Sequence, residues 1–301
     1  MNILLLAATI SVAVTDPRQP SPYPDGSRVV FCWRGDLWEA PGTGGVIRCL
    51  TPSPSFESFP AWSPDGSLVA FTSDRSGGGD VYVMPAGGGE ATRLTWYGGF
   101  DQVVGWSPGS DSVYFRSDRE ASPGWIYSAP VFGGAPGLLL AASVEGVSRS
   151  PSGLLAERGF TEWWRRHYSG SASRDVWSVE GGEWLPAACS PLDERWPLWV
   201  DGTGLVFVME DQAGNANFHA AGGADGLPVP LTSLDGGDVT FPALSADSRT
   251  IFFEYRGGLW RLDSGDWLPV EVPLDAAVDD PFPRHVETTV GTFTDEYSIL
   301  S

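Results

Sequence analysis

The stretch Trp62-Ser63-Pro64-Asp65-Gly66, followed by the apolar run Leu68-Val69-Ala70-Phe71, decides the fold because it recurs along the chain. Pro presets φ, Asp bonds its own backbone and Gly accepts positive φ, so the motif predicts a tight turn. The short apolar run after it is typical of a buried strand. Six copies of this turn are found, at Tyr23-Pro24-Asp25-Gly26, Trp62-Ser63-Pro64-Asp65-Gly66, Trp106-Ser107-Pro108, Ser150-Pro151-Ser152-Gly153, Asp201-Gly202 and Ser245-Ala246-Asp247.

A second motif follows each turn at a nearly constant distance. It consists of a small or polar residue, an apolar residue and usually an aromatic residue. Its copies are Asp36-Leu37-Trp38, Asp80-Val81-Tyr82, Trp125-Ile126-Tyr127, Asp175-Val176-Trp177, Asn217-Phe218-His219 and Gly258-Leu259-Trp260. The two series alternate without exception. Their period of about 40 to 50 residues is the length of one propeller blade.

Each repeat therefore predicts four short strands, closed by elements such as Arg93-Leu94-Thr95. A four-stranded sheet with two apolar faces needs neighbours on both sides, and a ring of such sheets provides them. We expect an all-β fold, a six-bladed β-propeller of four-stranded antiparallel blades, over residues 23–278. Hairpin turns are expected at residues 24–27, 64–67, 108–111, 151–153, 201–204 and 246–249, with no helix longer than three turns in between. Residues 1–22 form a signal-like segment or an N-terminal strand, and residues 279–301 begin a following domain.

Composition excludes several functions. The 38 acidic residues exceed the 18 basic ones, all of which are Arg, and give a net charge of −20. Such a surface repels nucleic acid, and a chain without Lys has no P-loop lysine. The three cysteines form no CxxC pair, and Asp235-Gly236-Gly237-Asp238 lacks the spacing of a calcium loop. We therefore expect no metal and no cofactor.

No catalytic motif was found. The chain has no nucleophile elbow, no His-Glu-x-x-His and only three histidines, His167, His219 and His285. His219 stands where other repeats place an aromatic residue, which indicates a structural role in a strand. We expect no catalytic residue in this chain.

The N-terminus bears on localisation. Residues 3–10 are apolar and precede the small residues Ser11-Val12-Ala13, a pattern that favours a secretory signal and a periplasmic or secreted protein. The alternative is a cytoplasmic protein in which this segment is a first strand. No other apolar run approaches the roughly 18 residues of a spanning helix, so membrane insertion is not expected.

The Ser-Pro-Asp-Gly turn, the Asp-apolar-aromatic strand and the Arg-Leu-Thr close resemble the TolB-type WD40-like repeat. Three stretches are more similar to the first propeller of tricorn-type serine peptidases: Gly35-Asp36-Leu37-Trp38-Glu39, Asp80-Val81-Tyr82-Val83-Met84-Pro85-Ala86-Gly87-Gly88, and Glu162-Trp163-Trp164-Arg165-Arg166-His167-Tyr168-Ser169-Gly170. In that family a second propeller, a helical segment, a PDZ-like domain and catalytic domains follow. The resemblance implies that the active-site residues lie in those domains, and that this chain is a fragment of a longer peptidase, a truncated reading frame or a single-domain relic. It also implies that the full-length family members form homo-oligomers.

The third stretch is an insertion outside the repeat, over residues 160–174. Its Trp163, Trp164, Arg165, Arg166 and His167 form the one cluster typical of recognition, because an Arg fork grips a carboxylate while an aromatic ring covers the peptide. We expect these five residues to bind peptides at the channel mouth. The alternative is that they pack on a neighbouring blade or on another domain.

The resemblance implies a non-catalytic propeller that gates peptides for an oligopeptide-cleaving enzyme. A stand-alone TolB-like propeller that binds a protein or peptide partner is the alternative. A propeller enzyme that uses residues lining its channel is a third possibility.

Overall fold

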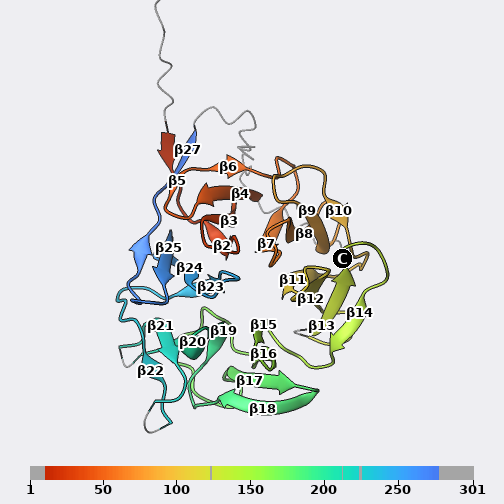
Figure 1. Ribbon diagram of the computed structural model, residues 1–301. Coiled ribbons are helices and arrows are strands. Elements are labelled where there is room, and N and C mark those ends of the chain that lie inside the picture. The colour runs from red at the N-terminus through yellow and green to blue at the C-terminus, as the bar shows by residue number, and fades with distance from the viewer. Residues whose placement is uncertain (1–10, 123, 212, 224–225, 278–301) are drawn as a thin grey trace, which may run out of the picture.

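Short strands and tight turns make up the fold. A computed structural model describes residues 11–122, 124–211, 213–223 and 226–277, and these contain no helix. They form six four-stranded antiparallel sheets and one three-stranded sheet. The six sheets stand around a central opening with their innermost strands facing it (Figure 1). The structure thus confirms an all-β propeller, and no described helix could cross a membrane.

Five of the four-stranded sheets use four consecutive strands, and the first one skips β5; we call these sheets blades one to six. Blade one has β2 (Arg18–Pro22), β3 (Arg28–Trp33), β4 (Asp36–Pro41) and β6 (Arg48–Cys49). Blade two has β7 (Glu57–Trp62), β8 (Leu68–Ser73), β9 (Asp80–Pro85) and β10 (Thr92–Arg93). Blade three has β11 (Asp101–Trp106), β12 (Ser112–Ser117), β13 (Trp125–Pro130) and β14 (Gly137–Leu140).

The second half repeats the pattern. Blade four has β15 (Gly146–Ser150), β16 (Gly153–Arg158), β17 (Asp175–Glu180) and β18 (Glu183–Ala188). Blade five has β19 (Arg195–Val200), β20 (Gly204–Glu210), β21 (Ala216–Ala220) and β22 (Val229–Pro230). Blade six has β23 (Thr240–Leu244), β24 (Thr250–Tyr255), β25 (Gly258–Asp263) and β26 (Val270–Glu271). All six expected hairpin turns join the first and second strands of their blades.

One pair of cross-strand neighbours recurs in every blade, on the second and third strands. The pairs are Phe31 with Trp38, Phe71 with Tyr82, Phe115 with Tyr127, Ala156 with Trp177, Phe207 with His219, and Phe253 with Trp260. The His219 ring is buried and stacks on Phe207 with 6.5 Å between centroids. Burial lowers its pKa. The structural role predicted for His219 is confirmed.

A threonine links the second motif to the end of the blade. The Thr95 hydroxyl accepts a hydrogen bond from the Val81 backbone N–H at 2.9 Å. The same bond joins Thr51 to Leu37 at 2.8 Å and Thr232 to Phe218 at 3.0 Å. This bond satisfies a buried backbone donor and explains why the Leu-Thr close recurs.

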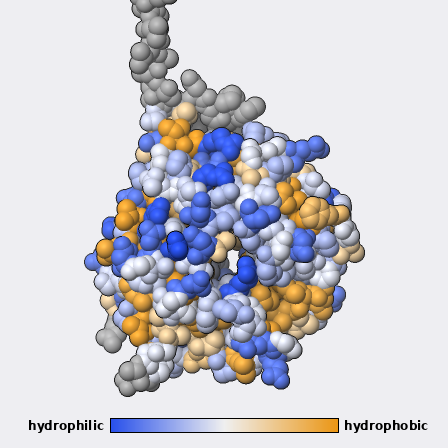
Figure 2. Space-filling view, in the orientation of Figure 1, coloured by the Kyte–Doolittle hydropathy of each residue, from blue (hydrophilic) through white to orange (hydrophobic). Residues whose placement is uncertain are grey.

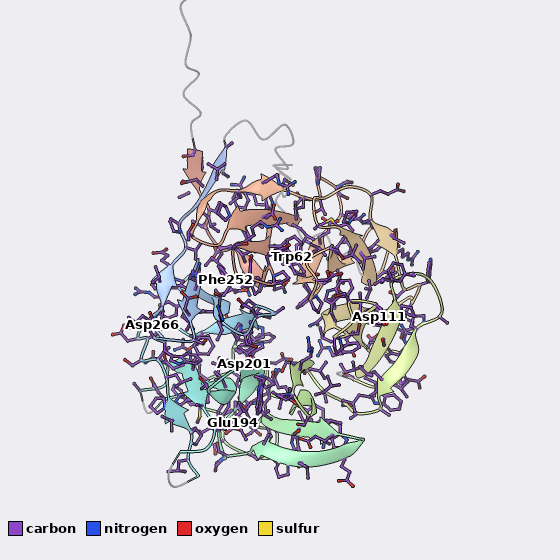
Figure 3. All side chains as sticks on the ribbon, viewed as in Figure 1. Trp62, Asp111, Glu194, Asp201, Phe252 and Asp266 are labelled. Carbon is purple, nitrogen blue, oxygen red and sulfur yellow. The ribbon has the colours of Figure 1, made fainter. Side chains whose placement is uncertain are left out.

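Within the described residues, no strand is shared between the first and last blades. Instead, β1 (Ser11–Ala13), β27 (Leu274–Ala277) and β5 (Gly45–Val46) form the three-stranded sheet outside the blades (Figure 1). Phe252 of blade six packs with Val29 and Phe31 of blade one (Figure 3). Glu254 joins the same blades, because it accepts the Gln19 backbone N–H at 2.6 Å and pairs with Arg18 at 2.8 Å.

The first blade begins earlier than the sequence suggested. We placed the propeller from residue 23, but β2 already occupies Arg18–Pro22. The sequence assigned these residues to the segment 1–22, a signal-like segment or an N-terminal strand outside the propeller, because Pro20 and Pro22 are unfavourable in a central strand. Strand β2 is an edge strand whose unpaired side faces the central opening. Pro is tolerated on that side because no neighbouring strand needs its missing N–H. Of the expected signal segment only β1 is described, and the tail 279–301 lies outside the described residues, so export and the following domain stay predictions.

Candidate functional site

A central cavity of about 770 Å³ runs between the blades. It is lined by residues of β2, β7, β11, β15, β19 and β23, the innermost strands of all six blades. Trp62 of blade two and Asp201 of blade five are among the lining residues (Figure 3). The surface view shows a narrow opening at the centre of the ring (Figure 2). The cavity volume lies within the range of ordinary ligand sites.

Four innermost strands carry an aligned bulge near their start. The dipeptides are Gln19-Pro20, Phe59-Pro60, Trp196-Pro197 and Phe241-Pro242, and the first residue of each is left-handed, with φ of 53°, 50°, 49° and 48°. The strand register shifts at each of these positions. A non-glycine residue in this region costs about 1–3 kcal/mol, and such strain is concentrated at functional sites. All four residues line the cavity.

These residues were missed in the sequence, although a signal was present. The repeated X-Pro dipeptide precedes the hairpin turn at similar spacing in four of the six repeats. An X-Pro pair that recurs in register indicates a shared backbone feature. Only the prolines inside the turn motifs, such as Pro64, entered the prediction.

The insertion, residues 160–174, lies between β16, which ends at Arg158, and β17, which begins at Asp175. Its base is fixed by Asp193, whose carboxylate accepts the Thr161 hydroxyl and the Arg174 backbone N–H, both at 2.8 Å. Arg174 is buried and bonds Glu157. The other Glu157 oxygen accepts the Trp196 backbone N–H at 2.8 Å. The base of the insertion is therefore tied to the innermost strand of blade five.

The insertion extends over one end of the cavity. Glu157 pairs with Gly146 in register, so the insertion leaves β16 beside the start of the innermost strand β15. We call this end the insertion mouth. From there the Trp163 ring reaches to 5.5 Å from Phe241 of blade six, centroid to centroid. The Arg18 guanidinium of blade one lies 5.7 Å from the Trp163 ring. The insertion therefore joins blade four to the first and last blades.

The five predicted site residues lie in three places. Trp163 and Trp164 line the central cavity. Arg165 and Arg166 instead line a side pocket of about 30 Å³ that also contains Trp163 and Arg195. His167 lies outside both and bonds Glu210, through its backbone N–H at 2.8 Å and its Nδ1 at 3.2 Å. The structure therefore brings the tryptophans, but not all five residues, to the cavity.

The two arginines differ in their partners. Arg166 forms an ion pair with Asp238 at 2.6 Å, which ties the insertion to the segment before β23. Arg165 lies over the Tyr168 ring at 4.4 Å. Among the described residues, no carboxylate oxygen lies within 4 Å of the Arg165 guanidinium. Arg165 is thus the better placed of the two to receive an anion.

Two buried acids lie at the start of innermost strands, Glu57 as the first residue of β7 and Glu194 directly before β19. Glu57 and Glu194 are fully buried, and burial raises the pKa of each carboxyl to about 7. Glu57 still pairs with Arg75 at 2.8 Å, which opposes that rise. Glu194 accepts the Ser190 backbone N–H at 3.2 Å. Within the described part of the chain, no group of three metal-binding side chains is found.

Six consecutive four-stranded sheets around a lined cavity define a β-propeller domain. The family described as the tricorn protease N-terminal beta propeller domain matches residues 18–267. The chain therefore belongs to this family, as the resemblance predicted. Tricorn protease homolog 1 of Streptomyces coelicolor is 30% identical over 270 residues, which cover 85% of this chain and 25% of that protein. The chain thus spans about a quarter of the curated relative.

Solved structures agree on the fold. The crystal structure of the tricorn protease matches with a TM-score of 0.73 at 19% identity, over 86% of this chain and 26% of that one. The propeller of the trilobed protease from Pyrococcus furiosus, reported with an open velcro topology, matches with a TM-score of 0.57 at 9% identity. The match covers 86% of this chain and 97% of that one. A putative TolB from Agrobacterium tumefaciens matches with a TM-score of 0.54 at 16% identity, over 85% of this chain and 80% of that one.

Proposed function

We propose that this propeller conducts or gates peptides through its central cavity, as the N-terminal domain of a tricorn-type peptidase. The observation that carries the proposal is the cavity of about 770 Å³ lined by all six blades and partly covered by the insertion. A short extended peptide fits such a volume, whereas a folded domain does not. The TolB-type alternative rests on the fold alone, because that similarity is 16% identical.

Arg165 is the residue suited to hold the carboxyl end of such a peptide. It is exposed, and its planar guanidinium matches a carboxylate while keeping its charge at any physiological pH. Arg166 is already occupied by Asp238. Of the two arginines expected to bind the peptide carboxylate, Arg165 is therefore the principal contact.

A plugged cavity tests the proposal. A Cβ atom added at Gly146 meets no atom within 4 Å, and Gly146 lines the cavity. We expect Gly146→Trp to weaken the binding of a labelled pentapeptide by about tenfold or more, measured by fluorescence anisotropy. The control is Gly137→Trp, on the outer strand β14, where an added Cβ atom is equally unobstructed. Equal binding by both variants would exclude the cavity as the binding site.

A further inference from the structure

Trp164 is exposed to an unusual degree for a residue that lines a cavity. Its side chain is 63% exposed, while Trp62 and Trp106, which also line the cavity, are 6% and 5% exposed. A large indole left in water gives up the favourable burial that the other tryptophans obtain. An exposed aromatic group inside a concave site is the usual mark of a recognition surface.

The Trp164 ring is nevertheless firmly supported. It meets Trp163 edge-on, with 5.5 Å between ring centroids. Trp163 is held in turn by Phe241 at 5.5 Å and by the Arg18 guanidinium at 5.7 Å. Arg18 is fixed by its 2.8 Å ion pair with Glu254. The support for Trp164 therefore comes from blades one and six as well as from its own insertion.

The backbone under the two tryptophans is also fixed. The Glu162 carbonyl accepts the Arg165 backbone N–H at 2.9 Å, which closes a turn around Trp163 and Trp164. The same carbonyl accepts the Arg195 guanidinium of blade five at 3.1 Å. A ring presented on a fixed turn loses little conformational freedom when a ligand stacks on it.

The surroundings indicate which side chain would stack there. Phe59, Trp196 and Phe241 of the strained bulges line the same cavity, together with the prolines that follow them. Arg18 already occupies a cation site beside Trp163 and Phe241, so a second cation there would meet its positive charge. An uncharged aromatic side chain fits these walls best, through offset or edge-to-face contacts.

We infer that Trp164 is an aromatic subsite at the insertion mouth, which selects peptides carrying an aromatic side chain. This inference rests on the proposed peptide channel and adds a specificity to it. Stacking of one aromatic ring on a fixed indole is expected to improve binding about three- to tenfold. Trp164 would thus determine which peptides are retained, and would take no part in bond cleavage.

Peptide pairs test the inference on the intact chain. Fluorescence anisotropy is measured with a labelled pentaalanine peptide and with analogues that carry phenylalanine or arginine at the centre. We expect the parent protein to prefer the phenylalanine analogue over pentaalanine by about three- to tenfold. Trp164→Ala should abolish the preference, and Trp164→Phe should keep part of it. The matched control is Trp96→Ala, since Trp96 is 67% exposed, lies between β10 and β11, and is not among the cavity residues.

Each outcome decides between the two proposals. Equal binding of the phenylalanine and alanine peptides, or a preference that survives in Trp164→Ala, overturns the subsite but leaves the channel. A preference for the arginine analogue also overturns it, because the subsite would then be cationic. Failure of the parent protein to bind any of the three peptides overturns the subsite and the proposed channel together. Thermal unfolding of Trp164→Ala verifies that the variant is folded.

Discussion

The Trp163 ring in the blade-four insertion lies 5.5 Å from the Phe241 ring on the innermost strand of blade six. These residues belong to blades that are not neighbours in the ring, with blade five between them. The contact therefore requires the insertion to pass over blade five at the insertion mouth. Arg166 strengthens this crossing through its 2.6 Å ion pair with Asp238.

Loosening that ion pair should expose the insertion to trypsin, which cleaves after arginine. Asp238→Asn removes the charge that holds Arg166 and keeps the oxygen that accepts the Ala216 backbone N–H. A partly exposed pair contributes up to about 1 kcal/mol, so cleavage after Arg165 and Arg166 should accelerate up to about fivefold. Asp235→Asn, at a nearby exposed position, should leave the rate unchanged. Unchanged cleavage in Asp238→Asn would show that the pair does not hold the insertion.

The repeated threonine bond should contribute to stability. Thr95→Val keeps the shape of the side chain but leaves the buried Val81 N–H without its 2.9 Å partner. We expect a loss of about 1–3 kcal/mol in the free energy of unfolding, measured in urea. Thr92→Val changes an exposed residue of β10 and should cost little. A similar loss in both variants would indicate a general cost of the substitution.

The amino-acid pattern was sufficient to predict the blades, because each turn and strand is specified by residues close together in the sequence. The Ser-Pro-Asp-Gly turn at residues 63–66 specifies its hairpin by itself, and the strands around the insertion followed from the repeat. Strand β2 was missed because Pro20 and Pro22 hide a strand whose edge faces the cavity. The contact of Trp163 with Phe241 and Arg18 could not be predicted from the sequence either. It depends on how the first and last blades meet when the ring closes, which the local motifs do not determine.

Glu194 should make stability depend on pH. Burial raises its pKa from the ordinary value to about 7, and the nearby Asp175 and Asp193 add to the rise. The folded state then retains a proton that the unfolded chain releases above pH of about 4.3, so the free energy of unfolding falls as pH increases toward and through 7.

Glu194→Gln should remove this part of the pH dependence, at most about 3 kcal/mol between pH 4.5 and 8. Urea unfolding at several pH values measures it. Glu183→Gln, at an exposed position of β18, should show the same change of unfolding free energy with pH as the parent protein. A parental slope in Glu194→Gln would mean that Glu194 is ionised in the folded protein.

Arg165 should distinguish peptides by their C-terminus. Arg165→Ala is expected to weaken binding of a free-carboxyl peptide about tenfold, because a charge-assisted bond of roughly 1.5–3 kcal/mol is lost. The amidated peptide should be nearly unaffected. Arg166→Ala should have the smaller effect, because Asp238 already occupies that guanidinium. Equal losses for free and amidated peptides would assign Arg165 a packing role, and no loss for either would remove it from the site.

Photo-crosslinking locates the bound peptide without any substitution in the protein. A pentapeptide with a benzophenone side chain at its centre is irradiated with the chain, and the attachment sites are mapped by mass spectrometry. We predict attachment to the innermost strands that line the cavity, such as β7, β11, β15 and β19, and to Trp163 and Trp164. Attachment confined to the outermost strands, such as β10, β14, β18 and β22, would contradict a peptide channel through this propeller.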